Sequence, residues 1–102
     1  MFKYAVRFSK KGDMVYISHL DLMNLFQRAI RRADLPFVLT QGFTPHIKIS
    51  MKNALRLGAE SECECFEFKL QKEVDVKETA ELLNGQLPEG IRVTGFEKRM
   101  EK

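Results

Sequence analysis

A chain of 102 residues, of which 44% are hydrophobic and 10% aromatic, can bury one modest two-layer core but not a large enclosed active site. No apolar run approaches the ~20 residues that span a bilayer, and Lys3 and Arg7 interrupt the apolar N-terminal segment, which excludes a signal peptide. We therefore expect a soluble cytoplasmic protein with no membrane contact.

The charge is unevenly distributed along the chain. Residues 1–56 carry 10 Lys or Arg and 3 Asp or Glu, a net charge of +7, whereas residues 57–102 carry 7 and 11, a net charge of −4. Basic surfaces attract polyanions, so we expect the functional surface to lie in the first half of the chain.

The first half predicts a strand followed by an amphipathic helix. Apolar and polar residues alternate over residues 2–9, as in a half-buried strand. Ser18 stands at an N-cap position with Asp21 three residues later, and Pro36 prevents the helix from continuing far beyond Asp34. The side chains predicted to face the core are Leu22, Leu25, Phe26, Ala29, Ile30 and Ala33.

Turn residues and apolar periodicity define the remaining elements. Residues 37–40 and 46–51 predict an irregular hairpin with a turn at Gln41-Gly42, in which Ile47 and Ile49 share one face and the polar residues between them share the other. A long loop over 52–62 precedes a strand ending at residue 70, a helix over 76–87 and a strand over 91–96.

This order predicts a single domain, residues 1–102, of the α+β class. Its fold is expected to be a ferredoxin-like two-layer sandwich, an antiparallel sheet with two helices on one face. Leu25, Phe26, Phe66 and Phe68 should be buried. The charged run at 98–102 is expected to fray.

Five runs of residues occur in a fixed order: 7–12 (RFSKKG), 17–23 (ISHLDLM), 28–36 (RAIRRADLP), 41–46 (QGFTPH) and 54–62 (ALRLGAESE). Together they resemble the bacterial radical-SAM-linked domain of unknown function, densely over residues 4 to 70. The resemblance implies an accessory unit attached to, or encoded beside, radical S-adenosylmethionine proteins, with no assigned activity. It also implies a longer family domain, of which this chain is either a short member or the N-terminal part.

The three arginines of the predicted helix, Arg28, Arg31 and Arg32, fall three and four residues apart and form one exposed basic patch. Lys10 and Lys11 in the preceding turn are expected to add to it. Such a patch binds RNA phosphates or is simply a solvated face. Phe43 is predicted to anchor its loop in the core rather than to serve as a base-stacking platform.

Both histidines are candidate site residues. His19 begins the helix near the surface, and His46 shares the parity of Lys48 and Ser50 on a polar strip. We expect the two histidines to flank one shallow anion site, to which Lys48 and Arg56 offer donors. The alternative is that both are inert surface residues.

No cofactor is predicted. Cys63 and Cys65 lack the spacing of a zinc knuckle, and the chain has neither a cysteine triad for an iron–sulfur cluster nor a phosphate-binding P-loop. Three hypotheses remain. The leading one is an RNA-binding accessory domain, for transfer or ribosomal RNA, that serves a radical-SAM RNA-modifying system and is not an enzyme on its own. The others are an RNA-processing enzyme using His19 or His46, and a protein-docking module for a radical-SAM partner.

Overall fold

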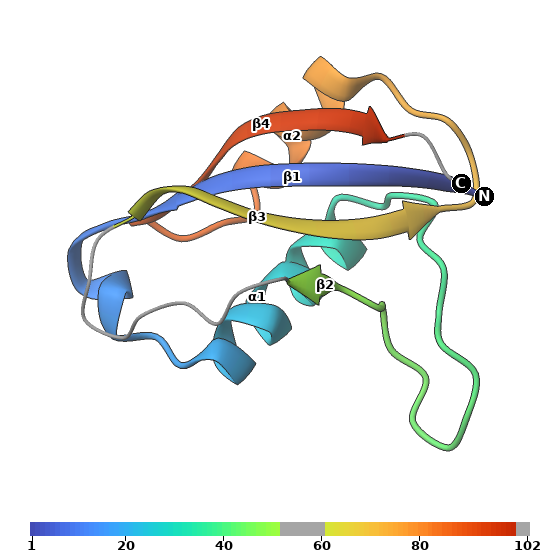
Figure 1. The fold of residues 1–102 in the computed structure, drawn as a ribbon, viewed down its shortest axis with the longest axis horizontal. Coiled ribbons are helices and arrows are strands. Elements are labelled where there is room, and N and C mark those ends of the chain that lie inside the picture. The colour runs from blue at the N-terminus through green and yellow to red at the C-terminus, as the bar shows by residue number, and fades with distance from the viewer. Residues whose placement is uncertain (52–60, 100–102) are drawn as a thin grey trace.

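In the described part of the chain, four antiparallel strands form an open sheet that carries two α-helices on one face (Figure 1). These features come from a computed structural model that describes residues 1–51 and 61–99. The elements in chain order are β1 (Phe2–Lys10), the 3-10 helix η1 (Gly12–Tyr16), α1 (His19–Arg32), β2 (Ser50–Met51), β3 (Ser61–Leu70), α2 (Val76–Asn84) and β4 (Ile91–Arg99). The strand order is β2-β3-β1-β4, so the predicted ferredoxin-like sandwich is confirmed.

The alternation of β1 decides which side chains face the helices. Tyr4, Val6 and Phe8 are buried, and β1 pairs antiparallel with both β3 and β4. The register places Tyr4 opposite Phe68 and Val6 opposite Phe66, so the inward residues of adjacent strands form one apolar layer.

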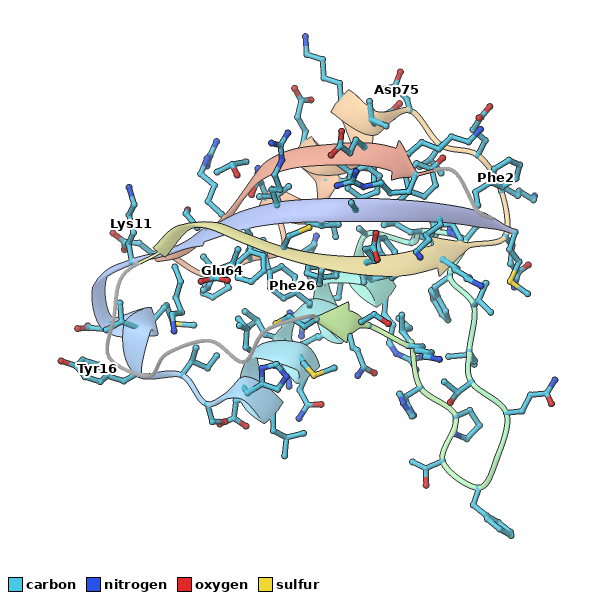
Figure 2. All side chains as sticks on the ribbon, viewed as in Figure 1. Phe2, Lys11, Tyr16, Phe26, Glu64 and Asp75 are labelled. Carbon is cyan, nitrogen blue, oxygen red and sulfur yellow. The ribbon has the colours of Figure 1, made fainter. Side chains whose placement is uncertain are left out.

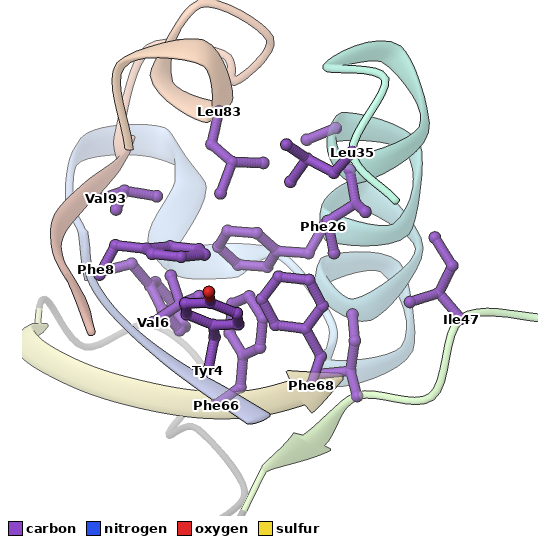
Figure 3. Close-up of a cluster of buried hydrophobic side chains, with 14 of the residues drawn as sticks. Tyr4, Val6, Phe8, Phe26, Leu35, Ile47, Phe66, Phe68, Leu83 and Val93 are labelled. Atoms are coloured by element: carbon purple, nitrogen blue, oxygen red, sulfur yellow. The ribbon is translucent and has the colours of Figure 1, made fainter. Parts of the chain in front are cut away.

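The core is an aromatic cluster between the sheet and α1 (Figure 3). The ring centroid of Phe26 lies 4.7 Å from that of Phe8 and 4.6 Å from that of Phe66. Phe26, Phe66 and Phe68 are buried as predicted, but the prediction for Leu25 is wrong, because this side chain is only partly buried at the flank of the helical stripe.

The predicted start of α1 is confirmed, because the Ser18 hydroxyl accepts a hydrogen bond from the Asp21 N–H at 3.1 Å. The helix ends two residues before Asp34, whose φ of 57° is left-handed. The Asp34 N–H donates to Arg31 O and the Leu35 N–H to Ile30 O, which is the Schellman pattern. Backbone geometry therefore ends α1 before Pro36 is reached.

The predicted hairpin is largely replaced by other contacts. Leu39 forms one isolated bridge with Ile47, but Phe37 pairs with Leu70 at the end of β3, and β2 is reduced to two residues. The Gln71 N–H donates to Pro36 O, so the residues just after α1 are held against β3. The predicted alternation is confirmed, because Ile47 and Ile49 are buried whereas Lys48 and Ser50 are exposed.

Three boundaries differ from the sequence predictions. Helix α2 ends at Asn84 instead of residue 87, because Gly85 caps it and Pro88 follows. Strand β3 begins at Ser61, inside the predicted loop. Strand β4 continues to Arg99, so residues 98 and 99 pair with β1 instead of fraying. The predicted loop over 52–60 lies outside the described residues.

Candidate functional site

The arginine face of α1, defined as Arg28, Arg31 and Arg32, is exposed as its spacing predicts. Within residues 1–51 and 61–99, none of the three forms an ion pair with a carboxylate. The Arg31 guanidinium lies 5.2 Å from the centroid of the Phe37 ring. This cation–π contact holds one arginine at the end of α1 while its donors remain open to solvent.

Several cations of the sheet are neutralised by nearby carboxylates. Lys3 lies 3.6 Å from Glu67, and Lys98 pairs with Glu73. The Arg99 guanidinium lies 3.2 Å from Glu97. The arginine face of α1 therefore has an unbalanced positive charge that these sheet cations lack.

Lys10 does not extend the arginine face, which corrects the sequence prediction. Its side chain is 1% exposed, and its ammonium donates to Val15 O at 3.5 Å. Lys10 has the same parity as Tyr4, Val6 and Phe8, so the strand directs it to the core side.

Two residues close the neck of the turn over residues 40–46. The Thr40 N–H donates to His46 O at 2.8 Å, and the His46 N–H donates to the Thr40 hydroxyl at 3.2 Å. His46 Nδ1 lies 3.0 Å from Thr44 O and 3.3 Å from Thr40 Oγ1, so both contacts of this ring nitrogen are within the turn.

Phe43 is fully exposed at the tip of this turn, so its predicted role as a core anchor is wrong. The turn projects away from the sandwich (Figure 1), and Ile47 and Ile49 already occupy the adjacent core. Phe43 therefore presents an aromatic ring to solvent, the arrangement that the base-stacking alternative requires.

The predicted site flanked by His19 and His46 stays a prediction. His19 is exposed at the first residue of α1, and no hydrogen bond or ion pair in the described part of the chain joins it to His46. Figure 1 shows the start of α1 and the projecting turn as separate parts of the molecule. Arg56 lies outside the described residues.

A pocket with a volume of about 420 Å³ lies between the sheet and the segment over residues 38–40. Three lysine side chains line it: Lys3, Lys48 and Lys69. Lys48 was predicted as a site residue from the sequence, but the other two lysines were not. Their shared outward parity is visible in the sequence, but their proximity depends on the register that places Lys3 opposite Lys69.

No cluster of three metal-ligating side chains occurs among the residues that the structure describes. Cys65 is a half-buried free thiol on β3. No helix in the same part of the chain is long and apolar enough to cross a membrane.

These features define a small α+β domain with an unneutralised basic helix face and a cationic pocket. Residues 3–102 match the profile of a family described as an uncharacterized protein conserved in bacteria (DUF2344), and the chain belongs to this family. No curated protein matches the sequence significantly.

Proposed function

We propose that this protein is an RNA-binding accessory domain of a radical-SAM RNA-modifying system. The observation that carries the proposal is the arginine face of α1, whose three guanidinium groups are exposed and have no carboxylate partner in the described chain. RNA supplies a row of phosphates, which favours a row of unpaired cations over the internally paired cations of the sheet.

The end of α1 is ordered in a way that suits phosphate binding. Arg31 rests on Phe37, and the segment after α1 is tied to β3 through the Gln71 side chain, whose amide donates to Phe37 O at 3.2 Å. A guanidinium that is already oriented loses less conformational entropy when two of its N–H groups donate to one phosphate. Arg31 is therefore the best-oriented cation of the arginine face.

The radical-SAM part of the proposal rests on the five ordered motifs that resemble the radical-SAM-linked domain. Two of them, residues 28–36 and 41–46, contain the arginine face and the projecting turn. In this role the domain supplies RNA affinity, and the radical-SAM partner supplies the iron–sulfur cluster and its chemistry. The expected substrates are transfer or ribosomal RNA.

The test is a combined reversal of Arg28, Arg31 and Arg32 to Glu. For single-stranded RNA, the logarithm of the binding constant falls by about 0.7 per phosphate contact for each tenfold rise in salt concentration. Loss of three contacts should therefore lower the steepness of this salt dependence by about 2. Between about 50 and 200 mM salt, the parent should then lose about 15-fold more affinity than the variant. Filter-binding titrations at several salt concentrations measure both quantities.

A matched control reverses three other exposed cations, Lys72, Lys77 and Arg92, at the α2 and β4 side of the sandwich. This control makes the same change in net charge but should retain most of the salt slope. Circular dichroism checks that both variants fold. Equal slopes for the two triple variants would refute a specific role for the arginine face.

A second candidate, a protein-docking module, is favoured by the exposure of Phe43. An aromatic side chain at the tip of a tied turn is the kind of anchor that fills a pocket in a partner. If Phe43 instead stacks on a base, Phe43→Ala should cost about 1–3 kcal/mol of RNA affinity. Unchanged RNA affinity, with lost binding to a purified radical-SAM protein encoded beside this one, would favour docking.

A further inference from the structure

We infer that the pocket between the sheet and residues 38–40 binds a phosphomonoester with a flat apolar body, that is, a nucleoside monophosphate unit. This site is separate from the arginine face and does not depend on the proposed RNA binding. Its volume of about 420 Å³ falls within the usual range for small-ligand pockets.

The charge inside the pocket favours an anion. Lys3 and Lys48 are two of the cations that line it, and Glu67 is the carboxylate among its lining residues that the structure describes. Lys3 approaches Glu67 at 3.6 Å and Arg99 approaches it at 4.0 Å. Glu67 is therefore shared between two cations, whereas Lys48 is exposed and has no partner in the described chain. An incoming phosphate completes the charge balance at Lys48.

Two hydroxyl groups of the same pocket supply uncharged donors. Thr40 and Ser50 line it together with Lys48. The Thr40 oxygen accepts from the His46 N–H at 3.2 Å and lies 3.3 Å from His46 Nδ1. In the tautomer that has its hydrogen on Nδ1, the Thr40 hydroxyl hydrogen can be donated to a ligand. A phosphate has enough acceptor oxygens for an ammonium and two hydroxyls together.

The lining of the pocket also has an apolar part. Val38 and Leu39 belong to it, and Leu39 remains partly exposed although it bridges to Ile47. Phe68 contributes little accessible area, because it is 2% exposed and packs in the core. A free inorganic phosphate would leave Val38 and Leu39 in contact with water. A nucleoside buries apolar area against them, so a nucleotide fits both parts of the lining.

Two parts of the chain set the spacing of these groups. The residue pairs Lys3–Lys69 and Ser50–Glu67 are cross-strand neighbours in the sheet, which fixes one wall. The Leu39–Ile47 bridge and the Thr40–His46 hydrogen bonds hold the other wall. The pocket is therefore formed before the ligand arrives.

The experiment is a titration of the full chain with adenosine 5′-monophosphate, adenosine and inorganic phosphate, followed by calorimetry and amide NMR shifts. The monophosphate should bind more tightly than either fragment and shift the amides of Thr40, Lys48 and Ser50. Lys48→Glu should weaken it by about tenfold or more, because an attraction becomes a repulsion at short range. Lys77→Glu, an equal charge change on α2, should leave it unchanged.

Lys48→Gln serves as a second variant, because it removes the charge without adding a carboxylate and should weaken binding to a smaller degree. The inference is overturned if adenosine binds as tightly as the monophosphate, if inorganic phosphate alone matches it, or if Lys77→Glu weakens it as much as Lys48→Glu. Amide shifts confined to other residues would overturn it too.

The phosphomonoester has two possible sources, a free nucleotide or the 5′ end of an RNA strand. Tighter binding of a 5′-phosphorylated oligonucleotide than of its 5′-hydroxyl form and of the monophosphate assigns the strand end, and the reverse order assigns the free nucleotide. Both results support the pocket. Reversal of the arginine face should leave monophosphate binding intact, so failure of the proposed RNA function remains distinguishable from failure of this site.

Discussion

Asp34 occupies a left-handed backbone conformation, and we predict that Asp34→Gly stabilises the protein. It is the one non-glycine residue with positive φ in the described ranges 1–51 and 61–99, at 57°. An L-residue pays up to ~1–2 kcal/mol for this conformation, although aspartate pays less than most, and glycine pays almost nothing. The carboxylate also faces the negative end of the α1 dipole, which costs a further ~0.3–1 kcal/mol.

The expected gain for Asp34→Gly is about 1 kcal/mol, because the greater freedom of glycine in the unfolded chain offsets ~0.4–1 kcal/mol of the benefit. Asp34→Asn should gain about half as much, since it removes the charge but keeps a side chain that tolerates positive φ. Asp34→Ala should be the least stable of the three substitutions. It removes the charge but has no local hydrogen bond to support the left-handed backbone.

Urea unfolding monitored by circular dichroism measures these differences in the free energy of unfolding. In a separate thermal unfolding experiment, a gain of about 1 kcal/mol should raise the melting temperature by about 4–8 °C. Asn24→Gly is the matched control, because Asn24 is exposed inside α1 and the change should destabilise by a few tenths of a kcal/mol. An alanine variant as stable as the glycine variant would refute the left-handed end of α1.

Three further predictions concern the edge of the sheet, the core and the histidines. Asn84→Ala should cost about 1–3 kcal/mol in urea unfolding, because the Asn84 amide donates to Val93 O and accepts from the Val93 N–H at 2.7 Å; an unchanged midpoint would contradict these bonds. Phe26→Ala should cost about 3–5 kcal/mol, and a loss below 1 kcal/mol in thermal unfolding would exclude a central place for this ring. Alanine at His19 or His46 should weaken anion or RNA binding in calorimetry with little change in melting temperature; a large stability loss with unchanged binding would return them to structural roles.

The features that the sequence predicted correctly depend mostly on neighbouring residues. Alternation sets the parity of β1, and the Ser18 hydroxyl caps α1 through an N–H only three residues away. Both effects act within a few residues, so they do not depend on the tertiary contacts that the rest of the chain makes. Because connections between elements follow general rules, the order of strands and helices is compatible with only a few sheet topologies.

The errors arise where distant residues compete for the same partner. Phe37 was expected to pair within a hairpin, but it bridges to Leu70, more than thirty residues further along the chain. This pairing displaces the turn from the sandwich, and Phe43 at its tip is exposed as a result. Local periodicity contains no information about which strand edge is free, so the pattern alone could not reveal this exposure.

The pocket was only partly predictable for the same reason. Lys48 was identified from the alternation of its own segment, whereas Lys3 and Lys69 meet it only after β1 and β3 have paired. An outward lysine on a strand is normally a solvated residue. The strand register brings Lys3 and Lys69 together, so that they line one pocket with Lys48.

The two helices carry opposite charges on their exposed faces, so charge is distributed unevenly over the molecule. Helix α1 carries the arginine face beside β2 and β3, whereas α2 packs against β4 and exposes Glu78 and Glu81. Figure 2 shows Asp75, the N-cap of α2, at the top of the view, whereas α1 lies in the lower half. Glu78 and Glu81 outnumber the exposed cation Lys77 on α2, so the RNA-binding proposal predicts a more favourable approach for a phosphate chain along α1. The projecting turn lies on the β2 side of the sheet, away from α2, so the same proposal predicts that RNA bound along α1 contacts this turn in preference to α2.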